Sequence, residues 1–350
     1  MSARAERLPD ARRAALREAK LRALVEGHWG AGILAPAPDA DASPHLAAIA
    51  DATGRGWALI DDGEVRSFGA SLAWAWRQGI EELHVLVEDP VGAGGAVIAR
   101  RAALFQPSPR VWRVDGRGVE QWPRVGADGP RRVEVLPDRE LESFAELIRS
   151  HGADPVFEHD SLTAEVLGLE VARARMGEDG WELVVGVGRH DRDARAQMRP
   201  GQRPAEALTE VVTEVRNWRR AGAARHPANS LAPERWLRSV IIARPAIAGA
   251  HHLRALPSPR RSIDLREPSP APAGGTARDE SPVVVVCSTG IDLDLVATAA
   301  DARHLWDRAA KLLLVVPDGD DYPVTRALAA ALAQPADVMT VPRDWSHLSD

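Results

Sequence analysis

The chain has 350 residues, enough for two or three compact units, and its 45% hydrophobic and 27% charged residues are ordinary globular values. A single cysteine, Cys287, excludes an intrachain disulfide and a cysteine zinc site, and no apolar run is long enough to cross a membrane. Because the chain has no such run, we expect a soluble, cytoplasmic protein with no membrane partner. The net charge of −6 gives no general reason to expect nucleic acid.

The first part of the chain predicts a basic helix, a linker and an α/β unit. Residues 10–26 place apolar side chains near helical spacing between basic ones, and the proline-containing residues 34–45 break any period. From Trp57 onward, strand-like and helical stretches alternate, which indicates a sheet flanked by helices. We therefore assign residues 1–50 to the basic helix and linker and residues 51–135 to an α/β unit.

The middle of the chain predicts a β-hairpin between two helices. Residues 138–149 begin with a capping Asp and predict a helix, and residues 205–222 predict an amphipathic helix closed by a glycine. Between them, two β-rich stretches at 162–175 and 181–190 flank the turn sequence MGEDG. The second stretch ends in the charged run RHDRD.

This hairpin and the helix behind it, about residues 155–222, resemble the core of the PD-(D/E)XK nuclease superfamily. In that family, an acid on the first strand and a Glu-x-Lys pair on the second hold Mg²⁺ or Mn²⁺, which activates water. Glu170 falls where the first-strand acid would be, but Gly186 and Gly188 stand in place of the family's Glu and Lys. The resemblance therefore implies either a divergent metal-dependent nuclease or a catalytically inactive relative that binds nucleic acid.

The charged run RHDRD supplies the remaining candidates for such a site. If the strand continues through it, Asp191 and Asp193 share one face and can join Glu170 in holding a hard cation. Arg189 or His190 would then replace the missing lysine as the donor to phosphate. The alternative is that these charged residues are a solvated exit from the strand.

A second signal is an excess of arginine over residues 216–261, where ten arginines face a single acid, Glu234. Guanidinium groups match phosphate oxygens and tryptophan stacks on exposed bases, so the segment predicts a polyanion partner. The residues that we expect to bind nucleic acid are Arg216, Arg219, Arg220, Arg225, Arg235 and Arg238. The alternative is that several arginines pair with the acids around 158–182. The nuclease-like core with this segment is assigned to residues 136–253.

The last part of the chain predicts a linker and a small parallel sheet. Residues 254–281 are rich in Pro, Gly and Ser, and residues 282–350 alternate as βαβαβ. Parallel sheets bind ligands beyond the carboxyl ends of their strands. Here those ends carry four candidate ligand residues, Ser288, Thr289, Asp318 and Asp320. Turn and capping chemistry is the alternative for the two acids.

The sequence thus predicts an α/β fold throughout and two functions of different classes. The first is a nucleic-acid-related protein with a degenerate PD-(D/E)XK-like core that binds polyanions. The alternative is a structural or regulatory protein whose C-terminal α/β unit binds a small ligand or a partner chain.

Overall fold

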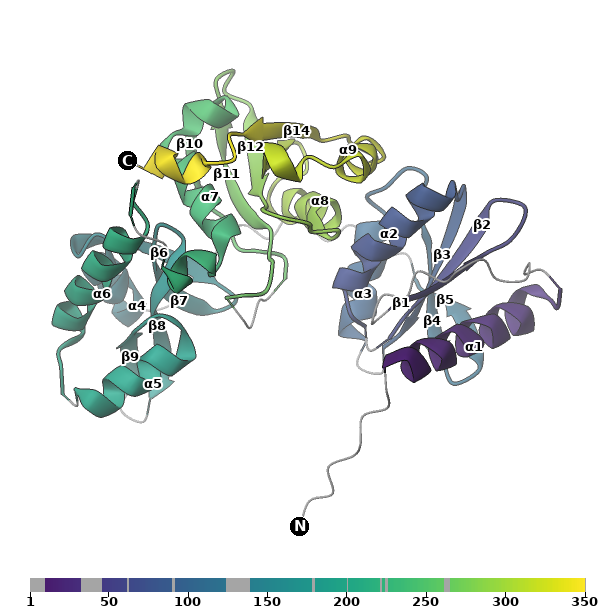
Figure 1. The fold of residues 1–350 in the computed structure, drawn as a ribbon, viewed down its shortest axis with the longest axis horizontal. Coiled ribbons are helices and arrows are strands. Elements are labelled where there is room, and N and C mark those ends of the chain that lie inside the picture. Colours follow the sequence, from purple (N-terminus) through teal and green to yellow (C-terminus); the bar gives the residue numbers. More distant parts are fainter. Residues whose placement is uncertain are drawn as a thin grey trace, which may run out of the picture. The chain divides into compact units, whose positions relative to one another are not determined.

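The computed structural model describes residues 10–32, 46–61, 63–89, 92–123, 139–177, 180–199, 201–220, 222–223, 226–260 and 265–349 (Figure 1). The fold is mixed α/β, as predicted, and its strands form three separate sheets. No helix in these ranges is long and apolar enough to cross a membrane. The chain divides into two compact units, and the first contains the described residues from 10 to 123 together with 293–301 and 322–335. The second unit contains the others.

The first unit is built on a five-stranded sheet of order β1-β2-β3-β4-β5. The parallel strands are β2 (Arg55–Ile60), β3 (Glu82–Glu88) and β4 (Arg110–Asp115), and they confirm the predicted alternation. Two antiparallel edge strands, β1 (Leu46–Ala50) and β5 (Gly118–Gln121), were not predicted. The parallel strands are connected by helices α2 (Arg66–Gln78) and α3 (Ala93–Ala102). Helix α1 (Asp10–Trp29) buries Leu21, Leu24 and Val25 against the sheet, which makes it a docking helix.

The second unit begins with a four-stranded antiparallel sheet, which we call the meander sheet. Its strands pair in chain order, β6 (Asp154–Glu158), β7 (Ser161–Val166), β8 (Leu169–Gly177) and β9 (Gly180–Val185). Helices α4 (Arg139–Ser150) and α6 (Pro204–Trp218) pack their apolar stripes on it, and α5 (Gly188–Met198) follows β9. The single strand expected over 162–175 is therefore wrong. These residues form two strands, β7 and β8, joined by a tight turn at Leu167 and Gly168, both of which have positive φ.

A second five-stranded sheet lies in the same unit, in the order β10 (Ala250–Ala255), β11 (Ala271–Ala277), β12 (Pro282–Cys287), β13 (Lys311–Pro317) and β14 (Asp337–Val341). The parallel β12–β14 confirm the predicted C-terminal sheet. The linker expected over residues 254–281 is wrong in part, because β11 is an inner, paired strand. Its small residues permit close packing: a Cβ on Gly274 would lie 2.7 Å from the Leu256 side chain.

The two five-stranded sheets carry the same motif. The series β2-α2-β3-α3-β4 matches β12-α8-β13-α9-β14, with α8 at Leu295–Trp306 and α9 at Pro323–Ala330, and each series has an antiparallel strand beside its first strand. The segment before the last strand is ALFQP at residues 103–107 and ALAQP at 331–335. These equivalent segments pair with each other within the first unit, where Gln106 N donates to Ala331 O and Ala333 N donates to Leu104 O, both at 2.8 Å.

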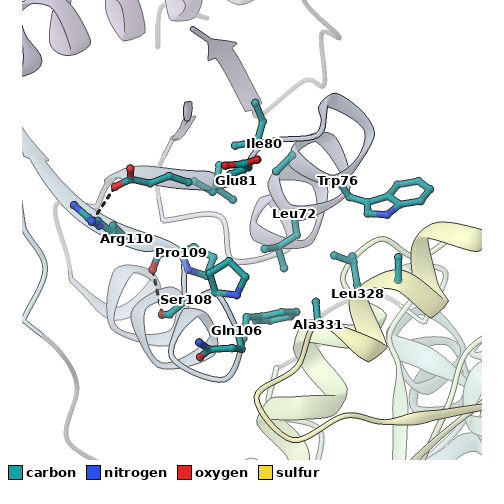
Figure 2. A pocket seen from close by; sticks show the side chains of 16 residues that line it. Leu72, Trp76, Ile80, Glu81, Gln106, Ser108, Pro109, Arg110, Leu328 and Ala331 are labelled. Carbon is teal, nitrogen blue, oxygen red and sulfur yellow. Dashed lines mark hydrogen bonds and ion pairs between the residues drawn. The ribbon is translucent and has the colours of Figure 1, made fainter. Parts of the chain in front are cut away.

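The helices of the two copies also meet in equivalent pairs within the first unit. Helix α2 packs against α9, and α3 contacts α8 through Arg101, which is closed to water and donates to Asp294 and Asp301. A cavity of about 290 Å³ lies beside α2 and α9, lined mainly by apolar side chains such as Leu72, Trp76 and Leu328 (Figure 2). The chain therefore contains an internal repeat whose copies contact each other.

Candidate functional site

The predicted metal-binding residues do not form one site. Glu170, on β8, is 4% exposed and its carboxylate is held by two arginines: Arg173 donates at 3.0 and 2.7 Å and Arg192 at 2.8 Å. Asp191 accepts from Val187 N at 2.8 Å and from Arg195 Nε at 3.0 Å. Across the described ranges, no group of three or more His, Cys, Asp or Glu side chains is placed to hold a metal ion. The carboxylates that the resemblance assigns to Mg²⁺ or Mn²⁺ therefore do not fit a metal here.

The expected continuation of the strand through RHDRD is wrong, because this run forms the first turns of helix α5. Gly186 and Gly188 have φ of 148° and 70°, which lets the chain leave the sheet and turn into the helix. A helix replaces the two-residue alternation, so Asp191 becomes a cap of the first turn and Asp193 is exposed. The side chains of Arg189 and His190 lie outside the described part of the structure.

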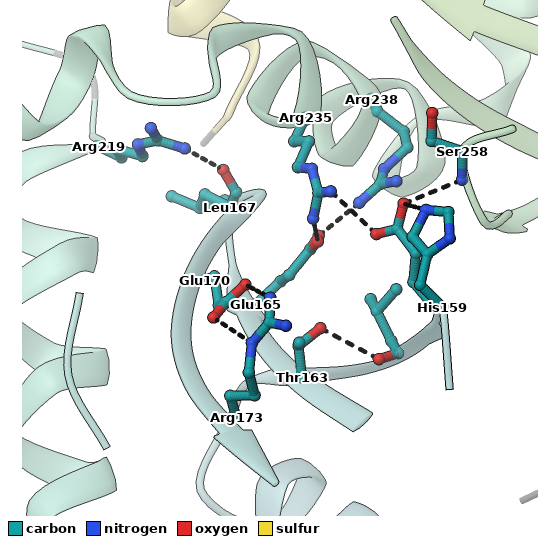
Figure 3. Close-up of polar contacts among 12 residues, drawn as sticks. His159, Thr163, Glu165, Leu167, Glu170, Arg173, Arg219, Arg235, Arg238 and Ser258 are labelled. Carbon is teal, nitrogen blue, oxygen red and sulfur yellow. Dashed lines mark hydrogen bonds and ion pairs between the residues drawn. The ribbon is translucent and has the colours of Figure 1, made fainter. Parts of the chain in front are cut away.

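Two of the predicted nucleic-acid-binding arginines, Arg235 and Arg238, are used inside the protein instead. Both lie on helix α7 (Pro233–Ala243) and reach the meander sheet, where Glu165 accepts from both of them (Figure 3). Arg235 also donates to Glu158 Oε2 at 2.9 Å. Burial acts to raise the pKa of Glu158, but Arg235, His159 and Ser258 N outweigh it and lower the pKa to about 2. The pairing of arginines with acids near 158–182 is therefore correct for this pair.

Arg219 is likewise a structural residue, with 1% of its surface exposed. Its guanidinium donates to the carbonyl oxygens of Leu167 at 2.7 Å and Ala228 at 3.2 Å, and to that of Leu231 (Figure 3 shows the first). It also lies 4.8 Å from the ring centroid of Trp236. Burial lowers the pKa of Arg219 to about 9. Arg216 and Arg220 are exposed, and Arg225 lies outside the described residues.

The predicted ligand residues at the C-terminal sheet lie in two loops that contact each other. Ser288 and Thr289 follow β12, and Asp318 and Asp320 form a short 3₁₀ turn after β13. The two loops are joined because Gly290 N donates to Asp320 Oδ2 at 2.6 Å. Ser288 is 1% exposed, and its hydroxyl has no hydrogen-bond partner within the described ranges. At the carboxyl edge of this sheet, the loop that carries Thr289 is therefore joined to the turn that carries Asp320.

One residue of this edge, Glu234, was not predicted. It lies in the first turn of α7, is 2% exposed, and its carboxyl accepts from Thr289 Oγ1 at 3.3 Å. Burial raises its pKa to about 7, and the nearby charge of Asp292 adds to the effect. Its carboxyl group therefore both donates and accepts hydrogen bonds near neutral pH. The only signal in the sequence is that Glu234 is the single acid among the ten arginines.

Comparisons with known proteins find no matching family model, curated protein or solved structure. The choice between the two predicted functions therefore depends on the positions and contacts of the predicted site residues. Three of the six arginines of the first function, Arg219, Arg235 and Arg238, are engaged in internal contacts. At the edge assigned to the second function, the loops of Thr289 and Asp320 contact each other and Thr289 contacts the buried Glu234. We call Glu234, Ser288, Thr289, Asp292 and Asp320 the edge site.

Proposed function

We propose that this chain is a regulatory protein that binds a small ligand at the edge site of its C-terminal sheet. The observation that carries the proposal is the buried carboxyl group of Glu234, which touches Thr289 just beyond the ends of two parallel strands. Ser288, which precedes Thr289, has a buried hydroxyl without a hydrogen-bond partner in the described ranges, and such a group costs about 1–3 kcal/mol.

The charges of the edge site favour a cationic ligand rich in hydrogen-bond donors. Asp320 carries negative charge beside Gly290, and Asp292 lies close enough to Glu234 to raise its pKa. A phosphate group placed here would meet like charge, whereas an ammonium or guanidinium group would form charge-assisted hydrogen bonds. The edge site therefore suits an amine or guanidine better than a nucleotide phosphate.

Agmatine, which carries both an ammonium and a guanidinium group, should raise the melting temperature of the full chain in a concentration-dependent way. A ligand at 100 times its Kd stabilises the folded state by about 2.7 kcal/mol. Differential scanning fluorimetry measures the shift, with inorganic phosphate as the probe of opposite charge. Asp320→Asn should abolish most of the shift, because it removes the charge beside Gly290.

The matched control for this experiment is Asp279→Asn, which removes an exposed acid paired with Lys311 in the same unit. This variant should keep the full response to agmatine. Equal shifts in the Asp320→Asn and Asp279→Asn variants would contradict the edge site, as would stabilisation by phosphate alone.

A polyanion partner is the second candidate, as expected for an inactive PD-(D/E)XK relative. It is favoured by the arginines of the 216–261 segment that remain exposed, namely Arg216, Arg220, Arg244 and Arg254. The paired state of Glu170 favours binding without cleavage.

If the protein binds duplex DNA, we expect a shallow salt dependence. Four phosphate contacts give a slope of log K against log [salt] of about −3.6, and Arg216→Ala with Arg220→Ala should flatten it by about 1.8. Fluorescence anisotropy at several salt concentrations checks both values, and a denaturing gel with Mg²⁺ or Mn²⁺ should show intact DNA. A slope near −9 would instead require all ten arginines, including those buried on α7.

A further inference from the structure

Helix α7 belongs to both halves of the second unit. Its apolar residues, among them Leu237, Val240 and Ile241, are buried in the core of the C-terminal sheet. Its polar residues Arg235 and Arg238 hold the acids of the meander sheet. The helix is therefore the element through which the C-terminal sheet and the meander sheet are joined.

We call the contacts of Arg235 and Arg238 with Glu158 and Glu165 the joint. Every charged group in the joint is largely closed to water. Arg238 and Glu165 expose 2% and 4% of their side chains, and Arg235 and Glu158 expose 13% and 7%. Glu158 also accepts from Ser258 N at 3.0 Å, just beyond β10 of the C-terminal sheet. Removing one partner of a buried pair leaves an uncompensated charge, so these contacts resist being opened one at a time.

The turn of the β7–β8 hairpin rests directly on the backbone of α7. A Cβ on Gly168 would lie 2.2 Å from the carbonyl of Arg235, so glycine allows the hairpin to approach the helix this closely. The preceding carbonyl, that of Leu167, accepts from Arg219, which in turn lies over the Trp236 ring of α7. A displacement of the first turn of α7 must therefore displace the hairpin, because packed interiors transmit strain.

The same first turn carries Glu234 of the edge site. Glu234 and Arg235 are neighbours in sequence, but Glu234 contacts Thr289 of the C-terminal sheet while Arg235 contacts Glu158 and Glu165 of the meander sheet. One helical turn rises about 5.4 Å, so Glu234 and Arg235, the contributions of α7 to the two sets of contacts, lie within a single turn. The two sets of contacts therefore share one rigid element.

We propose that α7 couples the edge site to the meander sheet: a change in the contact between Thr289 and Glu234 is transmitted through Arg235 and Arg238 to the β7–β8 hairpin. The biological role of this coupling rests on the proposed function, because the meander sheet would then be the part of the protein that responds to the ligand. The coupling itself is a property of the free protein and is measurable without a ligand.

The test is hydrogen–deuterium exchange of the full chain, read by mass spectrometry, in the wild type and in Thr289→Val. Valine keeps the shape of threonine but cannot donate to Glu234. We expect exchange over residues 161–171 to accelerate about fivefold, the factor that corresponds to one lost hydrogen bond of about 1 kcal/mol. Strand β3, in the other unit, should be unchanged and serves as the internal reference.

Thr340→Val is the matched control, because it makes the same substitution in the same sheet. Thr340 alternates along β14 with Val341, which belongs to the α7 core, so its side chain lies on the other face. An Arg235→Lys background should weaken the effect of Thr289→Val, since lysine cannot bridge two carboxylates as the guanidinium does.

Unchanged exchange of the hairpin in Thr289→Val would overturn the coupling, and so would equal acceleration in Thr289→Val and Thr340→Val. Both results are independent of the agmatine experiment. If hydrogen exchange shows the coupling but agmatine causes no melting shift, this inference stands and the proposed function fails. If agmatine causes the shift but the exchange of the hairpin is unchanged, the proposed function stands and this inference fails.

Discussion

Glu165→Gln should lower the free energy of unfolding of the second unit by about 3–5 kcal/mol, the largest single-site effect that we expect in this protein. Glu165 is the one carboxylate shared by Arg235 and Arg238, and it is 3% exposed. The amide of glutamine fills the same space but carries no charge. Two guanidinium groups would then remain near each other without the carboxylate that accepts from both of them, in a region where water cannot compensate.

Urea denaturation followed by circular dichroism measures this loss. Glu182→Gln is the matched control, because Glu182 pairs with Arg175 on the same sheet but exposes 48% of its side chain. Exposed pairs of this kind contribute little, so the control should unfold at the wild-type urea concentration within error. Equal losses in the two variants would show that the joint on α7 is no stronger than a surface pair.

The sequence predicted elements well wherever an apolar run is bounded by turn residues at both ends. The parallel strands of both five-stranded sheets are short apolar runs bounded by turn residues, and the structure places them where the runs are. The hairpin at Leu167 and Gly168 was missed because the apolar pattern runs through it, and a non-glycine residue at φ 47° leaves no turn signature. Strand β11 was missed because Ala, Pro and Gly resemble a linker in composition.

The internal repeat was hidden for a related reason. A parallel strand or a packed helix requires apolar character and length but no particular residue, so two copies can keep the motif and lose almost every identity. The segments 103–107 and 331–335 remain nearly identical. They are also the segments that pair with each other, where backbone geometry is most demanding.

The edge site could be predicted only in part. Ser288, Thr289 and Asp320 follow from the rule that places ligands beyond the carboxyl ends of parallel strands. Glu234 stands 55 positions before Thr289, and their contact depends on how α7 packs on the finished sheet. The same packing explains the failure of the arginine signal, since nothing in the sequence shows that Arg235 and Arg238 turn inward. Local pattern predicts elements, whereas these contacts are set by tertiary structure.

Two buried titratable groups should give the stability of the protein opposite dependences on pH. His84, on β3, is 2% exposed, and burial lowers its pKa to about 4. Trp112 Nε1 donates to His84 Nδ1 at 3.1 Å, so this nitrogen must be unprotonated. Glu234 is the reverse case, because burial raises its pKa to about 7 and favours its neutral form in the folded protein.

The sign of each effect follows from which state holds the proton. Between about pH 6.5 and 4, the unfolded chain protonates His84 but the folded protein does not, so stability is lost as the pH falls, by about 3 kcal/mol. Between about pH 4.5 and 7, the folded protein keeps the Glu234 proton that the unfolded chain releases, so stability is lost as the pH rises, by a similar amount. In the wild type, the two effects partly cancel where the windows overlap.

Single substitutions should separate the two effects in urea denaturation curves recorded from pH 4 to 7.5. Glu234→Gln removes the second effect, so its stability should rise steadily with pH up to about 6.5. His84→Phe removes the first effect and should show the opposite slope, with stability falling as the pH increases from 4.5 to 7. The slope is the measured quantity, because both substitutions also change the absolute stability by altering contacts with Thr289 or Trp112. Parallel curves for the two variants would mean that these groups ionise alike in the folded and unfolded states, and the buried carboxyl of the edge site would then lose its proposed role.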